Sequence, residues 1–141
     1  MTSVPAPANP HIIAVVALLD TALQGPPKAI HAHNGRRPDG DRTCVVVYGS
    51  PGMYSGSLGD RLSDVQIDLQ VTAVGESPEQ AQAFADRAAA ALLTDAPPAV
   101  DGRSVWRLWQ TAQPQPARRD DTVQPPLWIA TAQYAIASDP E

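Results

Sequence analysis

Apolar and polar residues alternate most regularly at the start of the segment from Asp64 to Leu93, which predicts a strand, a turn and a helix in that order. Every second residue from Val65 to Val71 is aliphatic and the residues between are polar, as is typical of a half-buried strand. Gly75 ends this pattern. Ser77-Pro78-Glu79-Gln80 then supplies a hydroxyl N-cap, a proline at the first helical position and a glutamine at the third, as in a capping box.

The residues after this cap predict a helix with one apolar face. Apolar side chains recur there at spacings of three and four, while charged and amide side chains lie mostly on the other side. The members of the apolar face are Ala81, Phe84, Ala85, Ala88 and Leu92. We expect this face to pack on the apolar side of the preceding strand, which gives a layer of helix on a layer of sheet.

A further helix is predicted near the N-terminus, from His11 to Leu23, where aliphatic residues recur at helical spacing. Asn9 is its candidate N-cap, Pro10 fits its first turn, and Gly25-Pro26-Pro27 ends it. Residues 1–9 are small and rich in proline, so we expect a flexible N-terminus.

Four more segments are predicted to be strands from their alternation or their β-branched and aromatic content. They are Lys28 to His33, Cys44 to Tyr48, Val105 to Trp109, and Leu127 to Ala137. The second is apolar throughout, which indicates a strand that is covered on both faces or lies at an interface. In the last, one face is formed by Trp128, Ala130, Ala132, Tyr134 and Ile136.

Two long segments are predicted to lack regular structure. Gly49 to Asp60 contains four glycines and is expected to be a long flexible loop. Gln113 to Pro126 contains four prolines and is expected to project as an arm or loop. The whole pattern predicts a single α+β domain over residues 1–141, with a mainly antiparallel or mixed sheet of about five strands and two helices packed on one face.

Composition narrows the class of protein and its partners. The chain has 141 residues, 43% hydrophobic and 18% charged, which is enough to bury one core. Its formal net charge of −5 argues against the basic surface of a sequence-reading nucleic-acid binder. The single cysteine, Cys44, excludes an intrachain disulfide and indicates folding in a reducing cytoplasm. We expect neither a signal peptide nor a membrane span.

The titratable residues form no catalytic or metal-binding pattern along the sequence. His31 and His33 share one face of a short strand without further ligands nearby in sequence, so we interpret them as exposed histidines at a strand end. Cys44 has no histidine near it in sequence and is interpreted as a small buried apolar residue. The glycine-rich segment lacks the spacing of a phosphate-binding loop or a nucleophile elbow. We therefore expect no enzyme activity, no metal and no cofactor.

The candidate contact residues lie in the two long segments. Met53, Tyr54 and Leu58 are the large apolar side chains of the glycine-rich segment and indicate a mobile contact loop. Arg118-Arg119-Asp120-Asp121 indicates either an ion-pair loop between subunits or a solvated loop, and the sequence favours neither. Both segments are candidates for contacts with other subunits or partners.

The order of these elements resembles the phage tail terminator family of long non-contractile tails, which includes tail-completion proteins. The resemblance rests on a helix, a loop, a strand ending in Tyr48-Gly49, the strand from Asp64 to Val74 with the segment from Gly75 to Ala81, and Arg119-Asp120-Asp121 before a closing strand. It covers nearly the whole chain. It implies a structural virion protein that forms a hexameric ring at the head-proximal end of the tail tube, stops tube polymerisation and offers a surface to the head-tail connector.

The resemblance also implies that the tail tube protein and the head-tail connector protein are partners, and that the protein is assembled in the host cytoplasm. DNA would pass through the ring without specific binding, and an acidic subunit suits this because negative charge around a pore repels phosphate. The alternatives are another phage neck or minor tail protein, or a cellular small-molecule-binding accessory α+β domain with the segment from Gly49 to Gly59 as its lid. No membrane partner is expected.

Overall fold

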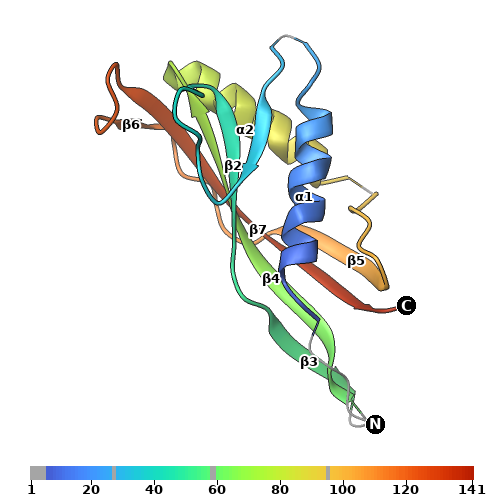
Figure 1. Cartoon of the computed structure of the whole chain (residues 1–141). Helices are drawn as coiled ribbons and strands as arrows, with labels where there is room; N and C mark the ends of the chain where they lie inside the picture. The colour runs from blue at the N-terminus through green and yellow to red at the C-terminus, as the bar shows by residue number, and fades with distance from the viewer. Residues whose placement is uncertain (1–5, 27, 58–59, 95) are drawn as a thin grey trace.

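The protein has two layers, a seven-stranded mixed sheet and two helices on one face of it (Figure 1). The structure is a computed structural model and describes residues 6–26, 28–57, 60–94 and 96–141. In these residues the elements are α1 (Asn9–Ala22), β1 (His31–Asn34), β2 (Cys44–Gly49), β3 (Met53–Ser57), β4 (Asp60–Gly75), α2 (Pro78–Leu92), β5 (Arg103–Gln110), β6 (Arg118–Asp120) and β7 (Leu127–Pro140). The predicted α+β class is confirmed, with seven strands in place of about five.

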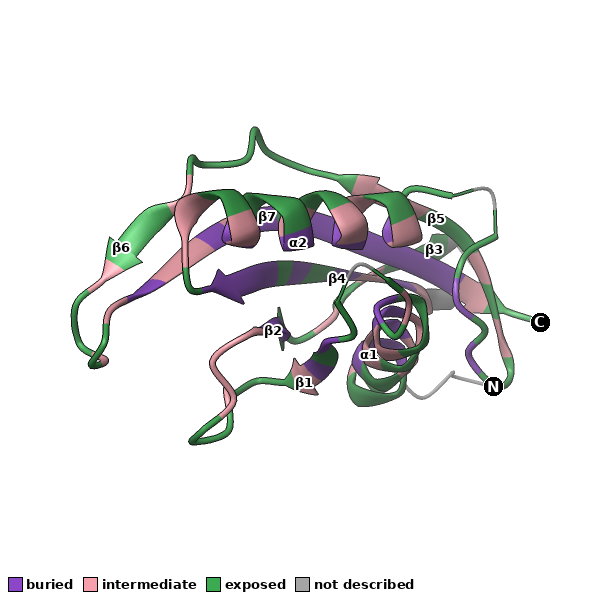
Figure 2. Ribbon diagram, turned by 90° about the horizontal axis from the view of Figure 1, so that it is seen from above, coloured by how far each residue is buried: buried purple, intermediate pink, exposed green. Residues whose placement is uncertain are grey.

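β4 and β7 form the centre of the sheet. The strand order is β1-β2-β4-β7-β5, with β3 paired to β4 and β6 paired to β7. β1 and β2 run parallel, whereas the other pairs are antiparallel. β4 pairs with β7 without interruption from Val65 opposite Ser138 to Gly75 opposite Trp128. Figure 2 shows buried backbone along much of both strands and exposed residues on the outward side of α2.

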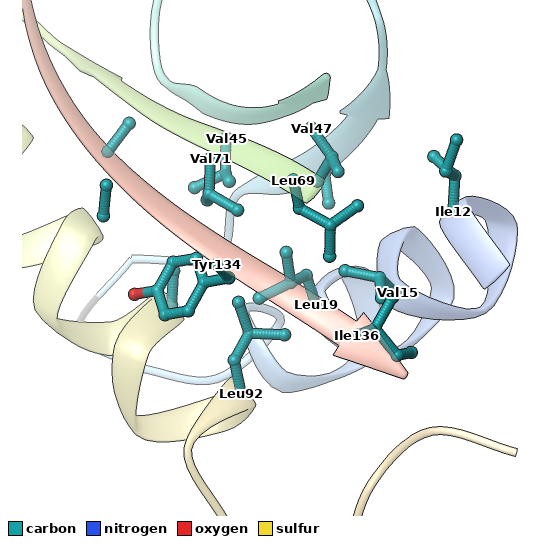
Figure 3. Packing of buried hydrophobic residues seen from close by; sticks show 14 of the residues in the cluster. Ile12, Val15, Leu19, Val45, Val47, Leu69, Val71, Leu92, Tyr134 and Ile136 are labelled. Carbon is teal, nitrogen blue, oxygen red and sulfur yellow. The ribbon is translucent and has the colours of Figure 1, made fainter. Parts of the chain in front are cut away.

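The predicted faces of β4 are confirmed. Val65, Ile67, Leu69 and Val71 are buried in the main core, which lies between the sheet and the helices. Figure 3 shows β4 and β7 side chains meeting α1 and α2 side chains there. Thr72 departs from the pattern because it is buried on the opposite face, beside Thr131 of β7.

The predicted cap of α2 is formed, with the Gln80 side chain bound one residue before the N-cap Ser77. The Ser77 hydroxyl accepts a hydrogen bond from the Gln80 backbone N–H at 3.1 Å, and the Gln80 side-chain oxygen accepts one from the Glu76 N–H at 2.7 Å. A Cβ at Gly75 would lie 2.6 Å from the Ala81 backbone nitrogen, so only glycine lets β4 end this close to the helix. The apolar face is buried at Ala81, Phe84, Ala88 and Leu92, and Ala85 is partly buried.

The boundaries of α1 differ slightly from the prediction. The helix begins at Asn9, two residues before the predicted His11, because the Ala8 carbonyl already accepts hydrogen bonds from the backbone N–H groups of His11 and Ile12. Ala8 is therefore the N-cap, not Asn9, and no side chain caps the helix. Of the predicted flexible segment 1–9, residues 1–5 lie outside the described residues, while Ala6 is buried and accepts a hydrogen bond from the Tyr54 hydroxyl.

The prediction of a long loop from Gly49 to Asp60 was wrong. β3 occupies Met53–Ser57 and pairs with the first part of β4, which begins at Asp60. The alternation rule missed this hairpin because its strands pair through the backbone while most of its described side chains stay outside the core. The hairpin extends away from the helices at one end of the molecule (Figure 1).

The segment from Gln113 to Pro126 was also predicted to lack regular structure, which is wrong for residues 118–120 and correct for the others. Arg118–Asp120 forms β6 and pairs with Leu127 to Ile129 of β7. These three residues are free of proline, so their backbone can join the edge of the sheet although prolines flank them on both sides.

An acidic substitution on the buried face of β4 should lower the free energy of unfolding far more than one on the opposite face. Ile67→Asp places an unpaired carboxylate where the side chain is fully buried and should lower the free energy of unfolding by several kcal/mol. Gln66→Asp, on the opposite face, should cost less than about 1 kcal/mol. Chemical denaturation of both variants measures this, and equal losses would contradict the assigned difference in burial between the two faces.

Candidate functional site

In the residues that the structure describes, the sheet face opposite the helices, here called the open face, is covered near one end. There Cys44 and Val46 of β2 pack with Val74 and Leu127 into a small second core, against which Val123 of the β6-β7 connection rests. Away from this end the open face presents polar side chains. The register places Tyr48, Gln70 and Gln133 side by side across β2, β4 and β7.

The open face combines large exposed side chains with polar ones, most of them uncharged, and with the exposed carboxylate of Asp68 in β4. Tyr48 is 41% exposed and Met53 of β3 is 63% exposed. Met53 is opposite Gln66, and Trp109 of β5 is opposite Ala135, which places both on this face. The Arg107 guanidinium lies 4.3 Å from the centre of the Trp109 ring. Tyrosine, tryptophan, methionine and arginine are the residues enriched in protein interfaces.

The three predicted contact residues of the glycine-rich segment differ in position and in exposure to solvent. Met53 points to solvent on the open face. Tyr54 lies on the helix side, where it packs against the main core and donates its hydroxyl hydrogen to the Ala6 carbonyl at 2.8 Å. Leu58 lies outside the described residues. Within the described part, Met53 is thus the residue of this group that is available to a partner.

The charged run at β6 is organised mainly within itself. Arg119 forms an ion pair with Asp121, and both side chains are more than half exposed. Asp120 accepts hydrogen bonds from the Thr122 hydroxyl and backbone N–H, which hold the pKa of that carboxyl below its usual range. Arg118 is opposite Ile129 and lines a hollow of the open face with Gln70 and Thr131. Arg118 and Asp120 alternate with Arg119 along β6, so both lie on the open-face side of this strand, and Arg118 lines the hollow.

A buried histidine and serine meet where α1, β5 and β7 converge. The His11 Nε2 lies 2.7 Å from the Ser138 hydroxyl, and its Nδ1 lies 3.1 Å from the Pro7 carbonyl. The Arg103 guanidinium donates to the Ser138 hydroxyl and to the carbonyls of Ser63 and Ser138. Because the Pro7 carbonyl can only accept, Nδ1 carries the proton and Nε2 of the neutral ring accepts from Ser138.

This pair has the atoms of a serine nucleophile and its base but not their accessibility. Ser138 is completely buried and His11 is 1% exposed, so no substrate carbonyl can approach the hydroxyl. The cluster instead fixes the start of α1 to the ends of β5 and β7. Sequence reasoning missed it because His11 and Ser138 are 127 residues apart and each is an isolated polar residue in its own element.

The His11 cluster should make stability depend on pH. Burial, reinforced by the positive charge of Arg103, lowers the pKa of His11 from 6.5. The unfolded chain therefore binds the proton more readily, so stability that is present above about pH 6.5 is lost as the pH falls below it. Denaturation at pH 7.5 and 5.5 should show a larger loss for the wild type than for His11→Gln. Equal losses would exclude His11 as the source.

A second titratable cluster lies at the β1 edge of the sheet. The His33 Nε2 is 2.7 Å from an Asp41 carboxylate oxygen, and ligand atoms of His33, Asp41 and Cys44 all lie within 4.8 Å of one another. Burial raises the pKa of the Cys44 thiol to about 12, and the carboxylate of Asp41 adds to this. His31, the other predicted strand-end histidine, is exposed and pairs with Asp20 instead. The sequence interpretation of Cys44 as buried is confirmed, but its isolation from histidine holds only along the sequence.

Comparison with known proteins assigns no family to this chain. No protein-family model matches it, and no curated protein is significantly similar to it. None of the helices in the described residues is long and apolar enough to cross a membrane. The function must therefore be argued from the surfaces and clusters above.

Proposed function

We propose that this protein is a phage tail terminator, a structural subunit that forms a hexameric ring on the head-proximal end of the tail tube. In this role it stops tube polymerisation and joins the tail to the head-tail connector. The order of its elements resembles that family, and the two-layer architecture is compatible with it.

The open face is the observation that supports this role best. A sheet face in contact with solvent alone usually carries many lysine and glutamate side chains. Here the central positions carry tyrosine, glutamine and threonine beside one exposed carboxylate, Asp68, with Met53 and the stacked Arg107 and Trp109 towards the β3 and β5 sides. This composition matches an interface that becomes covered on assembly.

The β3-β4 hairpin supplies the second element of the proposal. It projects beyond the helices and carries Met53 at its β3 edge, where another subunit can reach it (Figure 1). A subunit whose arm contacts a different surface of its neighbour forms head-to-tail contacts, and such contacts give closed rings when their rotation closes. We infer that the hairpin and the open face form the ring contacts.

The proposal predicts that charge on the open face blocks assembly without affecting folding. Met53→Glu adds a carboxylate to an exposed position, so the purified variant should keep the melting temperature of the wild type. Buried in an interface, the same carboxylate would lack a partner and should abolish rings in negative-stain images of assembled material. The matched control is Leu93→Glu, which changes an apolar side chain of similar exposure just after α2.

Gene deletion in the parent phage tests the role itself. Overlong or unjoined tails beside filled heads, rescued by wild-type protein and by Leu93→Glu but not by Met53→Glu, are the expected result. Normal virions after deletion would overturn the tail-terminator assignment. Full rescue by Met53→Glu would instead show that assembly does not use this surface.

A further inference from the structure

The parallel pairing of β1 and β2 gathers three metal-ligating side chains from separate positions in the chain. His31 is opposite Cys44 and His33 is opposite Val46, so His33 and Cys44 lie on the same face of the sheet. The connection between the two strands passes beside this face and brings Asp41 to His33. As a result, an imidazole nitrogen, a carboxylate oxygen and a thiol sulfur lie within 4.8 Å of one another.

The chemistry of this donor set fits zinc better than the other common divalent ions. Imidazole, carboxylate and thiolate are the three ligand types of protein zinc sites, whereas calcium and magnesium prefer oxygen ligands alone. With metal–ligand distances of about 2.0 to 2.3 Å, tetrahedral ligand atoms lie roughly 3.5 Å apart. The widest spacing, up to 4.8 Å, must therefore shorten by about 1 Å, while the His33 Nε2 and the Asp41 oxygen, which are 2.7 Å apart, must separate by about 1 Å to admit the ion.

The surroundings hold the ligands in place and leave an approach for the ion. Gly35 N–H donates to the Val47 carbonyl, and the Arg37 guanidinium donates to the Asp41 carbonyl at 2.9 Å, which fixes both ends of the connection. Cys44 is fully buried, while the side chains of His33 and Asp41 are 24% and 28% exposed. An ion can thus enter from the side of His33 and Asp41 and meet the sulfur beneath them.

We propose that His33, Asp41 and Cys44 form a zinc site with a fourth coordination position open to water. A neutral imidazole with one carboxylate and one thiolate balances the two positive charges of the ion. The bound ion would tie the connection between β1 and β2 to the edge of the sheet. This inference does not depend on the proposed role in the tail, because it rests on the side chains of one subunit.

Zinc titration of untagged, metal-stripped protein against a chromophoric chelator tests the site. The wild type should bind one equivalent and gain thermal stability, because a ligand that binds only the folded state stabilises it. Asp41→Asn keeps a hydrogen-bonding side chain but removes the charged ligand, and it should weaken binding by roughly tenfold or more. His31→Ala is the matched control, since this neighbouring histidine on the same strand pairs with Asp20 and should not affect binding.

Cobalt substitution provides a readout that a merely structural role for these residues would not change. Tetrahedral Co²⁺ bound to a thiolate should show visible ligand-field bands and a sulfur-to-metal charge-transfer band in the near ultraviolet. Cys44→Ala should remove the charge-transfer band. Wild-type binding no tighter than that of Asp41→Asn, a cobalt spectrum without the thiolate band, or equal weakening by His31→Ala would each overturn the proposal.

Discussion

The structure depends on the pairing of β4 with β7. These two strands run side by side from Val65 and Ser138 to Gly75 and Trp128, and every other strand except β1 pairs with one of them. Their helix-facing side chains supply the floor of the main core, on which α1 and α2 pack. Because side chains alternate along both strands, the same register that buries Leu69 and Tyr134 also places Gln70 and Gln133 on the open face.

This alternation explains why helices cover one face of the sheet, while most of the other face is left exposed for contacts with a partner. Two helices cover the first, and their apolar faces match the strands beneath them. On the second face, within the described part of the chain, the β6-β7 connection covers the end near Cys44 and Leu127. The uncovered remainder carries interface-type residues and continues towards the projecting hairpin, so the surface proposed for assembly is a direct consequence of the strand register.

Strong local patterns in the sequence predicted much of the fold, but they predicted little of the candidate sites. The β4 faces, the capped helix α2 and the closing strand were recognisable because burial and helix capping impose a period or a fixed spacing on neighbouring residues. β3 and β6 were missed because they are edge strands that pair through their backbones, and backbone pairing leaves little trace in side-chain type. Tyr48 could be assigned to a strand, but its position beside Gln70 and Gln133 needed the register.

The sequence by itself therefore determined the fold class, the central strand, both helices and the buried state of Cys44, since each follows from interactions between residues close in the chain. Only the tertiary structure decided that β1 pairs in parallel with β2, that His33 and Asp41 meet Cys44, and that His11 meets Ser138. These contacts join residues whose separation has no characteristic period. They result from the pairing of strands that are distant in the sequence, and a single sequence contains no local signal for which strands pair.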